Sequence, residues 1–140
     1  SDIWADEVNI DAICMWMFKN PQDYSVLVAE NMFGDIVSDL CAGLVGGLGF
    51  APSANLGDNY AVFEPTHGSA PKYAGQYKVN PIAMLLTAKL MFDWLKESDM
   101  ATRLESAIAR VIKEGKARTY DMGGNASTLD VANTVADYAG

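Results

Sequence analysis

The chain has 140 residues, of which half are hydrophobic, and it carries a formal net charge of −8 at pH 7. This length predicts one domain with one core, and the hydrophobic content predicts a folded rather than a disordered chain. The net charge argues against a nucleic-acid partner, because no face could carry enough Lys and Arg to neutralise a phosphate backbone. A negative chain can still bind a nucleotide locally, so that class of ligand stays open.

The sequence carries no membrane or secretion signal. It has no run of 18 or more apolar residues and no charged-then-apolar N-terminal pattern, which predicts a soluble, cytoplasmic protein without a membrane partner. Cys14 and Cys41 form no C-x-x-C pair and are predicted to be buried apolar residues rather than ligands or a disulfide. The chain starts at Ser1 without methionine and enters amphipathic sequence at once, so we expect a fragment or an engineered form.

The first third of the chain predicts two helices and a strand. Apolar residues at helical spacing over 3–18 predict the first helix, which Asn20-Pro21 ends. A short valine-rich run over 25–29, bounded by turn residues, predicts a buried strand. Residues 33–45 return to the helical period and stop at Gly46-Gly47.

The middle of the chain predicts a second strand and a long apolar helix. Residues 48–56 predict a loop that leads to an extended segment, and 60–63 predict the strand. Pro81 suits the first position of a helix over 82–95. That helix is apolar on most faces and is therefore expected to be a core or interface helix.

Two more helices follow, over 100–114 and from about 128 to Tyr138, with Gly115 ending the first. Their candidate N-terminal caps are Ser98 or Asp99 and Ser127 or Thr128, respectively. The pattern predicts an α/β fold with helices layered around a small sheet. Because two strands are few for an independent sheet, strands are expected to be missing, which supports a fragment.

Two carboxylates suggest a metal site. Asp35 and Asp39 are four residues apart, so both side chains project from one face of the predicted helix. The two carboxylates repel each other mildly when no ion is present, but a cation bound between them would be attracted to both. Hard oxygen ligands favour Mg²⁺ or Mn²⁺ over Zn²⁺. A solvated acidic helix face is the alternative, and it is the more common explanation of this spacing taken alone.

The segment after the second strand suggests a phosphate or cofactor site. His67, the only histidine, precedes Gly68-Ser69, where backbone N–H groups can approach a ligand closely. Lys72 is of the right type to pair with an extra phosphate on a cofactor ribose, and Tyr73 could add a hydroxyl donor. Both residues could equally be exposed parts of the loop.

Two motifs together carry a resemblance to a known family. Residues 31–39, Asn-Met-Phe-Gly-Asp-Ile-Val-Ser-Asp, and 64–71, Glu-Pro-Thr-His-Gly-Ser-Ala-Pro, resemble the β-decarboxylating dehydrogenases. That family includes isocitrate, homoisocitrate, 3-isopropylmalate and tartrate/D-malate dehydrogenases. The resemblance extends over 1–140 as a single segment and matches the C-terminal part of a family member. It implies a partial isocitrate/isopropylmalate dehydrogenase-like fold and a homodimer.

The resemblance also implies a metal site and a nicotinamide-cofactor site. Asp35 and Asp39 match the family's Mg²⁺ or Mn²⁺ ligands, and Asp11 matches a third aspartate that reaches into the partner subunit's site. The residues that match the cofactor site are His67, Gly68, Ser69, Ala70, Pro71, Lys72, Tyr73, Val79, Asn80 and Tyr120.

Within the family, these cofactor residues resemble those of NADP-dependent isocitrate dehydrogenases. Lys72-Tyr73 and Tyr120 match that type, whereas NAD-dependent members usually have an aspartate and an aliphatic residue in place of the first two. The bacterial NADP type also carries an arginine where Gly124 stands here, so part of the clamp on the 2′-phosphate is absent. NADP is therefore the expected cofactor, with NAD as the alternative.

The implied reaction is oxidation of a 2-hydroxy acid such as isocitrate, followed by metal-assisted loss of CO₂. The family's catalytic lysine and tyrosine and its substrate arginines lie upstream of the matched region, so no catalytic residue is assigned. Two hypotheses stay open. The chain is part of a metal-dependent NAD(P) oxidoreductase, or it is a truncated, non-catalytic relative that binds nucleotide or metal or associates with a partner.

Overall fold

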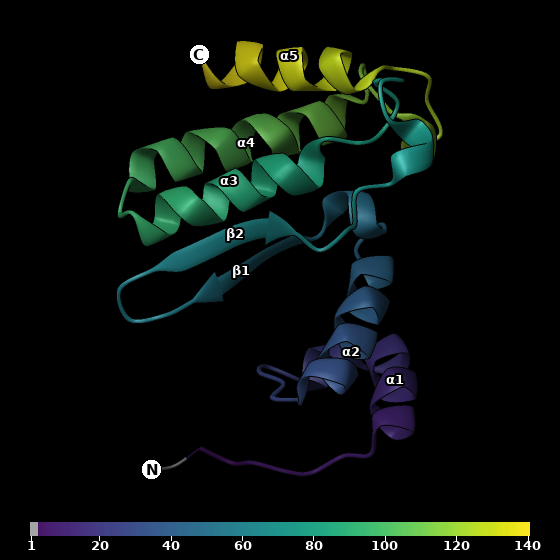
Figure 1. Cartoon of the computed structure of the whole chain (residues 1–140), viewed down its shortest axis with the longest axis vertical. Helices are drawn as coiled ribbons and strands as arrows, with labels where there is room; N and C mark the ends of the chain where they lie inside the picture. Colours follow the sequence, from purple (N-terminus) through teal and green to yellow (C-terminus); the bar gives the residue numbers. More distant parts are fainter. Residues whose placement is uncertain (1–2) are drawn as a thin grey trace. The chain divides into compact units, whose positions relative to one another are not determined.

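Five α-helices, four short 3₁₀-helices and one antiparallel pair of strands make up the regular structure of residues 3–140, which a computed structural model describes. The chain divides into two compact units, Ser1–Gly47 (unit 1) and Leu48–Gly140 (unit 2) (Figure 1). Each unit has its own cluster of buried apolar side chains, in contrast to the single core that the length predicts. Helices with a small sheet confirm the expected fold class.

Unit 1 is built from α1 (Ile10–Lys19) and α2 (Asn31–Leu44), which pack against each other. The two helices bury Ile13, Met17 and Val37 together, because these residues lie on the apolar stripe of each helix. Partly buried around them are Ile10, Tyr24, Leu40 and Cys41. The periodic spacing of apolar residues thus predicts both helices, although α1 begins seven residues later than expected at residue 10 rather than 3.

The segment between α1 and α2 is not a strand, contrary to the prediction for 25–29. These residues are irregular, and the exposed fractions of Val26 and Val28 are 81% and 95%. A strand needs a neighbour for its backbone hydrogen bonds, and within 3–140 the only strands are β1 (Pro52–Leu56) and β2 (Ala61–Pro65) of unit 2. Valine content alone therefore gives a wrong prediction here.

Unit 2 stacks three helices on a β-hairpin (Figure 1). β1 and β2 run antiparallel, with Pro52 opposite Pro65, and α3 (Ile82–Trp94) packs against both strands. On the other side of α3 lies α4 (Ser98–Glu114), and α5 (Thr128–Ala139) packs on α4. The apolar character of α3 on most faces is explained by this central position, as the sequence predicts for a core helix.

The larger apolar cluster fills the space between α3, α4 and α5. Its buried members are Ile82, Ala107, Ile108, Val111, Ala117, Val131 and Val135. Full burial of a branched aliphatic side chain contributes about 1.5–3 kcal/mol, so this cluster fixes the stack of helices. The packed helices thereby fix the ends of the loops that precede α3 and α5.

Local signals set most helix ends of unit 2. Ser127 caps α5 through a reciprocal pair of hydrogen bonds with Asp130, as expected. Gly115 ends α4 with a left-handed φ of 64°. The N-cap position of α4 is occupied by Glu97 rather than by Ser98 or Asp99, the two residues predicted there. No side chain makes a capping hydrogen bond at this end of the helix. Pro81 lies at the N-cap of α3, one position before the expected one.

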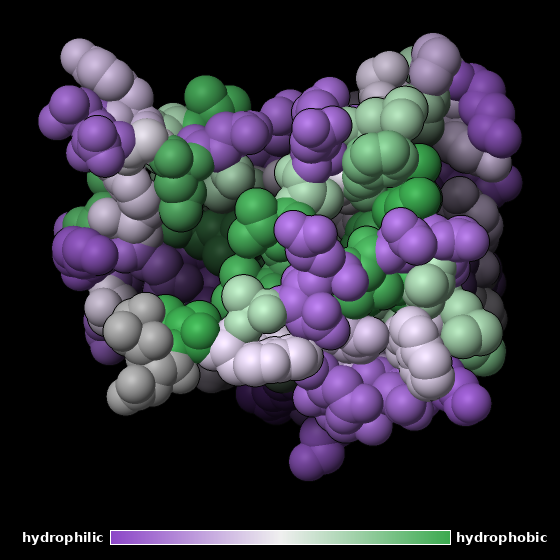
Figure 2. All heavy atoms as spheres, turned by 90° about the horizontal axis from the view of Figure 1, so that it is seen from below, coloured by the Kyte–Doolittle hydropathy of each residue, from purple (hydrophilic) through white to green (hydrophobic). Residues whose placement is uncertain are grey.

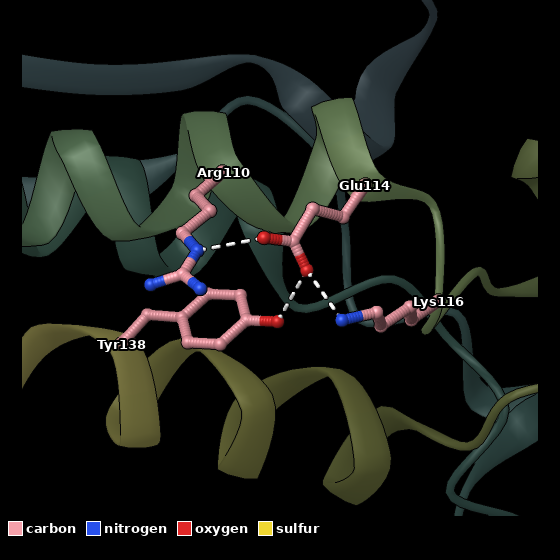
Figure 3. A network of polar contacts seen from close by, with 4 residues as sticks. All are labelled: Arg110, Glu114, Lys116 and Tyr138. Carbon is pink, nitrogen blue, oxygen red and sulfur yellow. Dashed lines mark hydrogen bonds and ion pairs between the residues drawn. The ribbon is translucent and has the colours of Figure 1, made fainter.

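A polar network links the end of α4 to α5 (Figure 3). The Glu114 carboxylate accepts hydrogen bonds from Arg110 Nε at 2.7 Å and from the Tyr138 hydroxyl at 2.7 Å, and it pairs with Lys116 Nζ at 2.9 Å. The Arg110 guanidinium also lies 4.0 Å from the centroid of the Tyr138 ring. Bonds from Arg110, Lys116 and Tyr138 lower the pKa of Glu114 to about 2.

Apolar side chains are also exposed in both units. Figure 2 shows apolar surface interrupted by polar side chains on the face of the molecule seen from below. The most exposed large apolar side chains include those of Ile3, Trp4, Phe18, Val26, Val28 and Tyr60. None of the helices in the described part of the chain combines the length and apolar character needed to cross a bilayer.

Candidate cofactor and metal sites

The loop between β2 and α3 contains most of the residues predicted to bind the cofactor. It leaves the hairpin at Thr66, whose N–H donates to Ala51 O at 3.1 Å, and then forms a 3₁₀-helix, Pro71–Tyr73. Ala70 and Tyr77 have left-handed φ values of 43° and 47°, which cost about 1–2 kcal/mol each for residues with a Cβ. Strained backbone of this kind concentrates at ligand-binding loops, which supports this loop as a site.

His67 is half-buried at the start of this loop. Its Nδ1 lies 2.9 Å from the carbonyl oxygen of Gly68. Since a carbonyl oxygen only accepts, Nδ1 carries a proton in this arrangement. Nε2 makes none of the hydrogen bonds found in residues 3–140 and is available to a ligand.

Two tyrosines and two lysines gather at the far end of the loop, and we call them the tyrosine–lysine cluster: Lys72, Tyr73, Lys78 and Tyr120. The ring centroids of Tyr73 and Tyr120 are 5.9 Å apart. Lys72 Nζ lies 4.8 Å from the Tyr73 centroid, and Lys78 Nζ lies 5.6 Å from that of Tyr73 and 5.2 Å from that of Tyr120. Two ammonium groups and two phenol rings thus come together from segments more than 40 residues apart.

The cluster changes the acidity of both phenols. The adjacent Lys72 ammonium, and then the Tyr120 hydroxyl, lower the pKa of Tyr73. The interaction with Tyr73 raises the pKa of Tyr120, and its burial raises it further. A phenol with a lowered pKa is a stronger hydrogen-bond donor, so Tyr73 is suited to donate to an anion.

A cavity of about 330 Å³ lies beside the cluster. Its walls are formed by Ser69, Ala70, Tyr73, Ala74, Gly75, Tyr77, Lys78, Val79 and Thr128. Ligand pockets in proteins have volumes of about 300–1,000 Å³, so this cavity could hold part of a nucleotide. Four of the ten predicted cofactor residues line this cavity, Ser69, Ala70, Tyr73 and Val79, and the other six lie outside its walls.

Asn80 has a side chain that the fold itself uses. It is 7% exposed, its amide N–H donates to Asp121 Oδ2 at 2.9 Å, and its Oδ1 accepts the N–H of Ile82 at 3.0 Å. The hydroxyl of the fully buried Thr119 donates to the other oxygen of Asp121. Asn80 therefore joins the start of α3 to the segment that carries Tyr120.

Gly124 lies where the bacterial NADP type carries an arginine, and the backbone leaves no room for any side chain. A Cβ on Gly124 would overlap the carbonyl oxygen of Arg118 and lie 2.8 Å from its carbonyl carbon. Two hydrogen bonds hold this turn closed, from Gly124 N–H to Thr119 O at 2.9 Å and from Ala126 N–H to Arg118 O at 2.8 Å. The absence of the arginine is thus part of the local backbone structure.

The three predicted metal ligands lie in unit 1. Asp35 and Asp39 are exposed on α2, one helical turn apart, and Asp11 is exposed in the first turn of α1. None of them takes part in an ion pair within residues 3–140, where no group of three or more acidic, Cys or His side chains lies close enough to hold a metal ion. One chain therefore presents Asp35 and Asp39 as two hard oxygen donors, which fit part of a Mg²⁺ or Mn²⁺ coordination shell.

A sequence model of the family described as isocitrate/isopropylmalate dehydrogenase matches residues 1–135. The chain belongs to the isocitrate/isopropylmalate dehydrogenase family. It is 50% identical over 135 residues to the 3-isopropylmalate dehydrogenase of Archaeoglobus fulgidus, covering 96% of this chain and 41% of that protein. It is 48% identical over 138 residues to the mitochondrial NAD isocitrate dehydrogenase catalytic subunit 5 of Arabidopsis thaliana, covering 98% and 37%.

Solved structures of similar proteins have the same fold. The isocitrate dehydrogenase of Methylococcus capsulatus matches with a TM-score of 0.89 at 41% identity, covering 93% of this chain and 39% of that one. A protein of Thermus thermophilus matches with a TM-score of 0.95 at 43% identity, covering 99% and 29%. The chain thus spans about two fifths or less of the length of these relatives.

The structure brings together only some of the residues that the family resemblance implies. Lys72, Tyr73 and Tyr120 meet in one cluster, and Asp35 and Asp39 share one face of α2. Lys78 also lies in this cluster, although the sequence motifs do not predict it as a cofactor residue. The signal that could indicate it is a second lysine, six residues after Lys72 in the same loop.

Proposed function

We propose that the chain is the C-terminal part of a metal-dependent oxidoreductase that prefers NADP and that oxidises and decarboxylates a 2-hydroxy acid such as isocitrate. The observation that carries this proposal is the tyrosine–lysine cluster beside the cavity, in a chain of this family. Members named for isocitrate and for 3-isopropylmalate are both among its relatives.

The preference for NADP follows from charge. NADP carries a phosphate on the 2′ position of its adenosine ribose, and a phosphate is bound best by cations and hydrogen-bond donors held close together. Lys72 supplies an ammonium group, and Tyr73 and Tyr120 supply hydroxyl donors beside it. An aspartate in place of Lys72 would instead repel the 2′-phosphate and accept hydrogen bonds from the free ribose hydroxyls of NAD.

The proposal includes a divalent ion at Asp35 and Asp39, with Asp11 contributed by a second copy of the chain in a homodimer. The exposed and unpaired carboxylates of α2 support this assignment. When bound, Mg²⁺ or Mn²⁺ supplies positive charge that stabilises a developing oxyanion on the substrate. The two aspartates, one turn apart on a rigid helix, would orient the ion.

The substitution Lys72→Asp tests the cofactor assignment. We expect Kd for NADP⁺ to rise at least about tenfold and Kd for NAD⁺ to change much less, because the new carboxylate repels only the 2′-phosphate. Calorimetric titration of the chain with each cofactor gives both constants. Lys113→Asp, at an exposed position on α4, makes the same charge change as a matched control and should leave both constants unaltered. Equal losses for the two cofactors in the Lys72 variant would contradict the proposal.

A further inference from the structure

The phosphate end of the proposed cofactor site lacks a cation at position 124. The carbonyl of Arg118 occupies the space of a side chain on Gly124, so no basic residue could be placed there without moving the turn. A 2′-phosphate carries close to two negative charges at neutral pH, and Lys72 alone supplies one positive charge. A second cation nearby would neutralise the phosphate more completely.

Arg118 is the basic residue nearest to Gly124 in sequence, and its side chain lies at the end of α4. Its guanidinium lies against Gly115 at the C-terminal end of α4, where a Cβ on Gly115 would be 2.7 Å from Arg118 Cζ. A cation is favourable at that end of a helix, because the last carbonyl groups carry partial negative charge. Arg118 therefore serves the end of α4 rather than the cluster.

Lys78 is the remaining basic residue at the cluster. Its ammonium lies over the faces of both Tyr73 and Tyr120, and its side chain lines the cavity. None of the ion pairs found among residues 3–140 involves Lys78 or Lys72, so neither charge is neutralised by a neighbouring carboxylate.

The backbone fixes the position of Lys78 from both sides. The carbonyl of Tyr77 accepts the N–H of Thr128 at 2.7 Å, and the carbonyl of Val79 accepts the Thr128 hydroxyl at 2.5 Å. Thr128 is the first residue of α5, so the segment around Lys78 is attached to the helical stack. The left-handed backbone of Tyr77, directly before Lys78, is held by the same attachment.

We propose that Lys78 provides the second cation for the 2′-phosphate of NADP, in place of the arginine that Gly124 excludes. Lys72 and Lys78 approach the phosphate with their ammonium groups, and Tyr73 and Tyr120 donate from their hydroxyls. Before the cofactor binds, the faces of the two rings hold the Lys78 ammonium close to this position by cation–π attraction. This inference rests on the proposed use of NADP and assigns a second lysine, beside Lys72, that contributes to its selectivity.

Binding of two small probes tests this assignment. 2′,5′-ADP carries the 2′-phosphate and 5′-AMP lacks it, so the ratio of their affinities reports on that phosphate alone. We expect Lys78→Met to lower the affinity for 2′,5′-ADP about tenfold and to leave 5′-AMP nearly unchanged. Lys78→Arg should retain the selectivity, because it keeps the charge, and Lys113→Met is the control for a lost lysine on the surface of α4.

The outcomes separate the two proposals. If Lys72→Met removes the preference for 2′,5′-ADP and Lys78→Met does not, the role of Lys78 is refuted and the NADP assignment stands. If the unsubstituted chain does not bind 2′,5′-ADP more tightly than 5′-AMP, both are refuted. Equal weakening of both probes by Lys78→Met would show a structural role for the lysine and also overturn the inference.

Discussion

Gly124 shows at the scale of one residue how a local backbone contact can change a binding site. The turn from Arg118 to Ala126 closes through hydrogen bonds that press the two backbone segments together, so only glycine fits at 124. The same contact removes a charged side chain from the surroundings of Tyr120. In the proposed NADP site, the cations therefore come from the loop that carries Lys72 and Lys78.

This contact predicts the effect of adding one methyl group. Gly124→Ala should destabilise the fold by about 1–3 kcal/mol, because its Cβ would overlap the Arg118 carbonyl and force the turn open. Thermal or urea unfolding followed by circular dichroism measures the change. Gly43→Ala is the control, since a Cβ there meets nothing within 4 Å and alanine favours the helix α2. Equal stability of the Gly124 variant and the unsubstituted chain would show that the turn is not packed as described.

Asp35→Asn tests the metal assignment at the same scale. Removal of one carboxylate should abolish tight Mn²⁺ binding, measured by calorimetry or electron paramagnetic resonance, and leave the helical content intact. Without metal, the loss of repulsion between positions 35 and 39 should stabilise α2 by about 0.2–0.5 kcal/mol. Asp23→Asn, in the 3₁₀-helix Pro21–Asp23 of unit 1, is the control and should bind Mn²⁺ as before. If the Asp35 variant bound Mn²⁺ with unchanged affinity, Asp35 would not be a metal ligand.

Motifs predict the residues of the site better than they predict its geometry. Lys72, Tyr73 and Tyr120 follow from the resemblance, and the structure places them together, although their roles stay predictions. Lys78 and the packing of Gly124 depend on contacts between segments far apart in sequence, and no local pattern contains that information.

At the scale of secondary-structure elements, amphipathic helices are the predictable part. α4 repeats its apolar residues on one face, so the sequence alone indicates its extent to within two residues. Strands are less predictable because each needs a partner, and the valine-rich run over 25–29 has none within the described residues. β1 forms instead from a segment with proline and serine, since the turn at Gly57–Tyr60 folds it back on β2.

The network at the end of α4 makes the packing of α5 dependent on pH. The pKa of Glu114 is lowered from its ordinary value of 4.5 to about 2, so its charged form stabilises the folded state. This contribution is complete above about pH 4.5 and is lost as pH falls from there towards 2. Thermal unfolding measured at pH 6, 4 and 3 should show a fall in Tm that Glu114→Gln reduces.

The control for this effect is Glu7→Gln, which changes an exposed carboxylate whose side chain makes no ion pair within residues 3–140. It should leave the dependence of Tm on pH as it is in the unsubstituted chain. If Glu114→Gln and Glu7→Gln have the same small effect, the bonds from Arg110, Lys116 and Tyr138 do not stabilise the fold in solution.

At the scale of the whole molecule, the chain presents two units that carry different parts of the proposed chemistry. Unit 1 carries the aspartates and unit 2 carries the cofactor loop. Large apolar side chains are exposed in both units, and Figure 2 shows such green surface on one face of the molecule. Surface of this kind is what further protein covers. This fits a chain that spans only 29 to 41% of the relatives compared with it.

The relative affinity of the unsubstituted chain for NADP⁺ and NAD⁺, measured by calorimetry in one buffer at fixed ionic strength, tests the central claim most directly. Fixed salt matters because screening weakens the attraction between lysines and the 2′-phosphate. The account predicts that NADP⁺ binds at least about tenfold more tightly, as expected for a phosphate held by two ammonium groups and two hydroxyls. Equal affinity for the two cofactors, or tighter binding of NAD⁺, would contradict it.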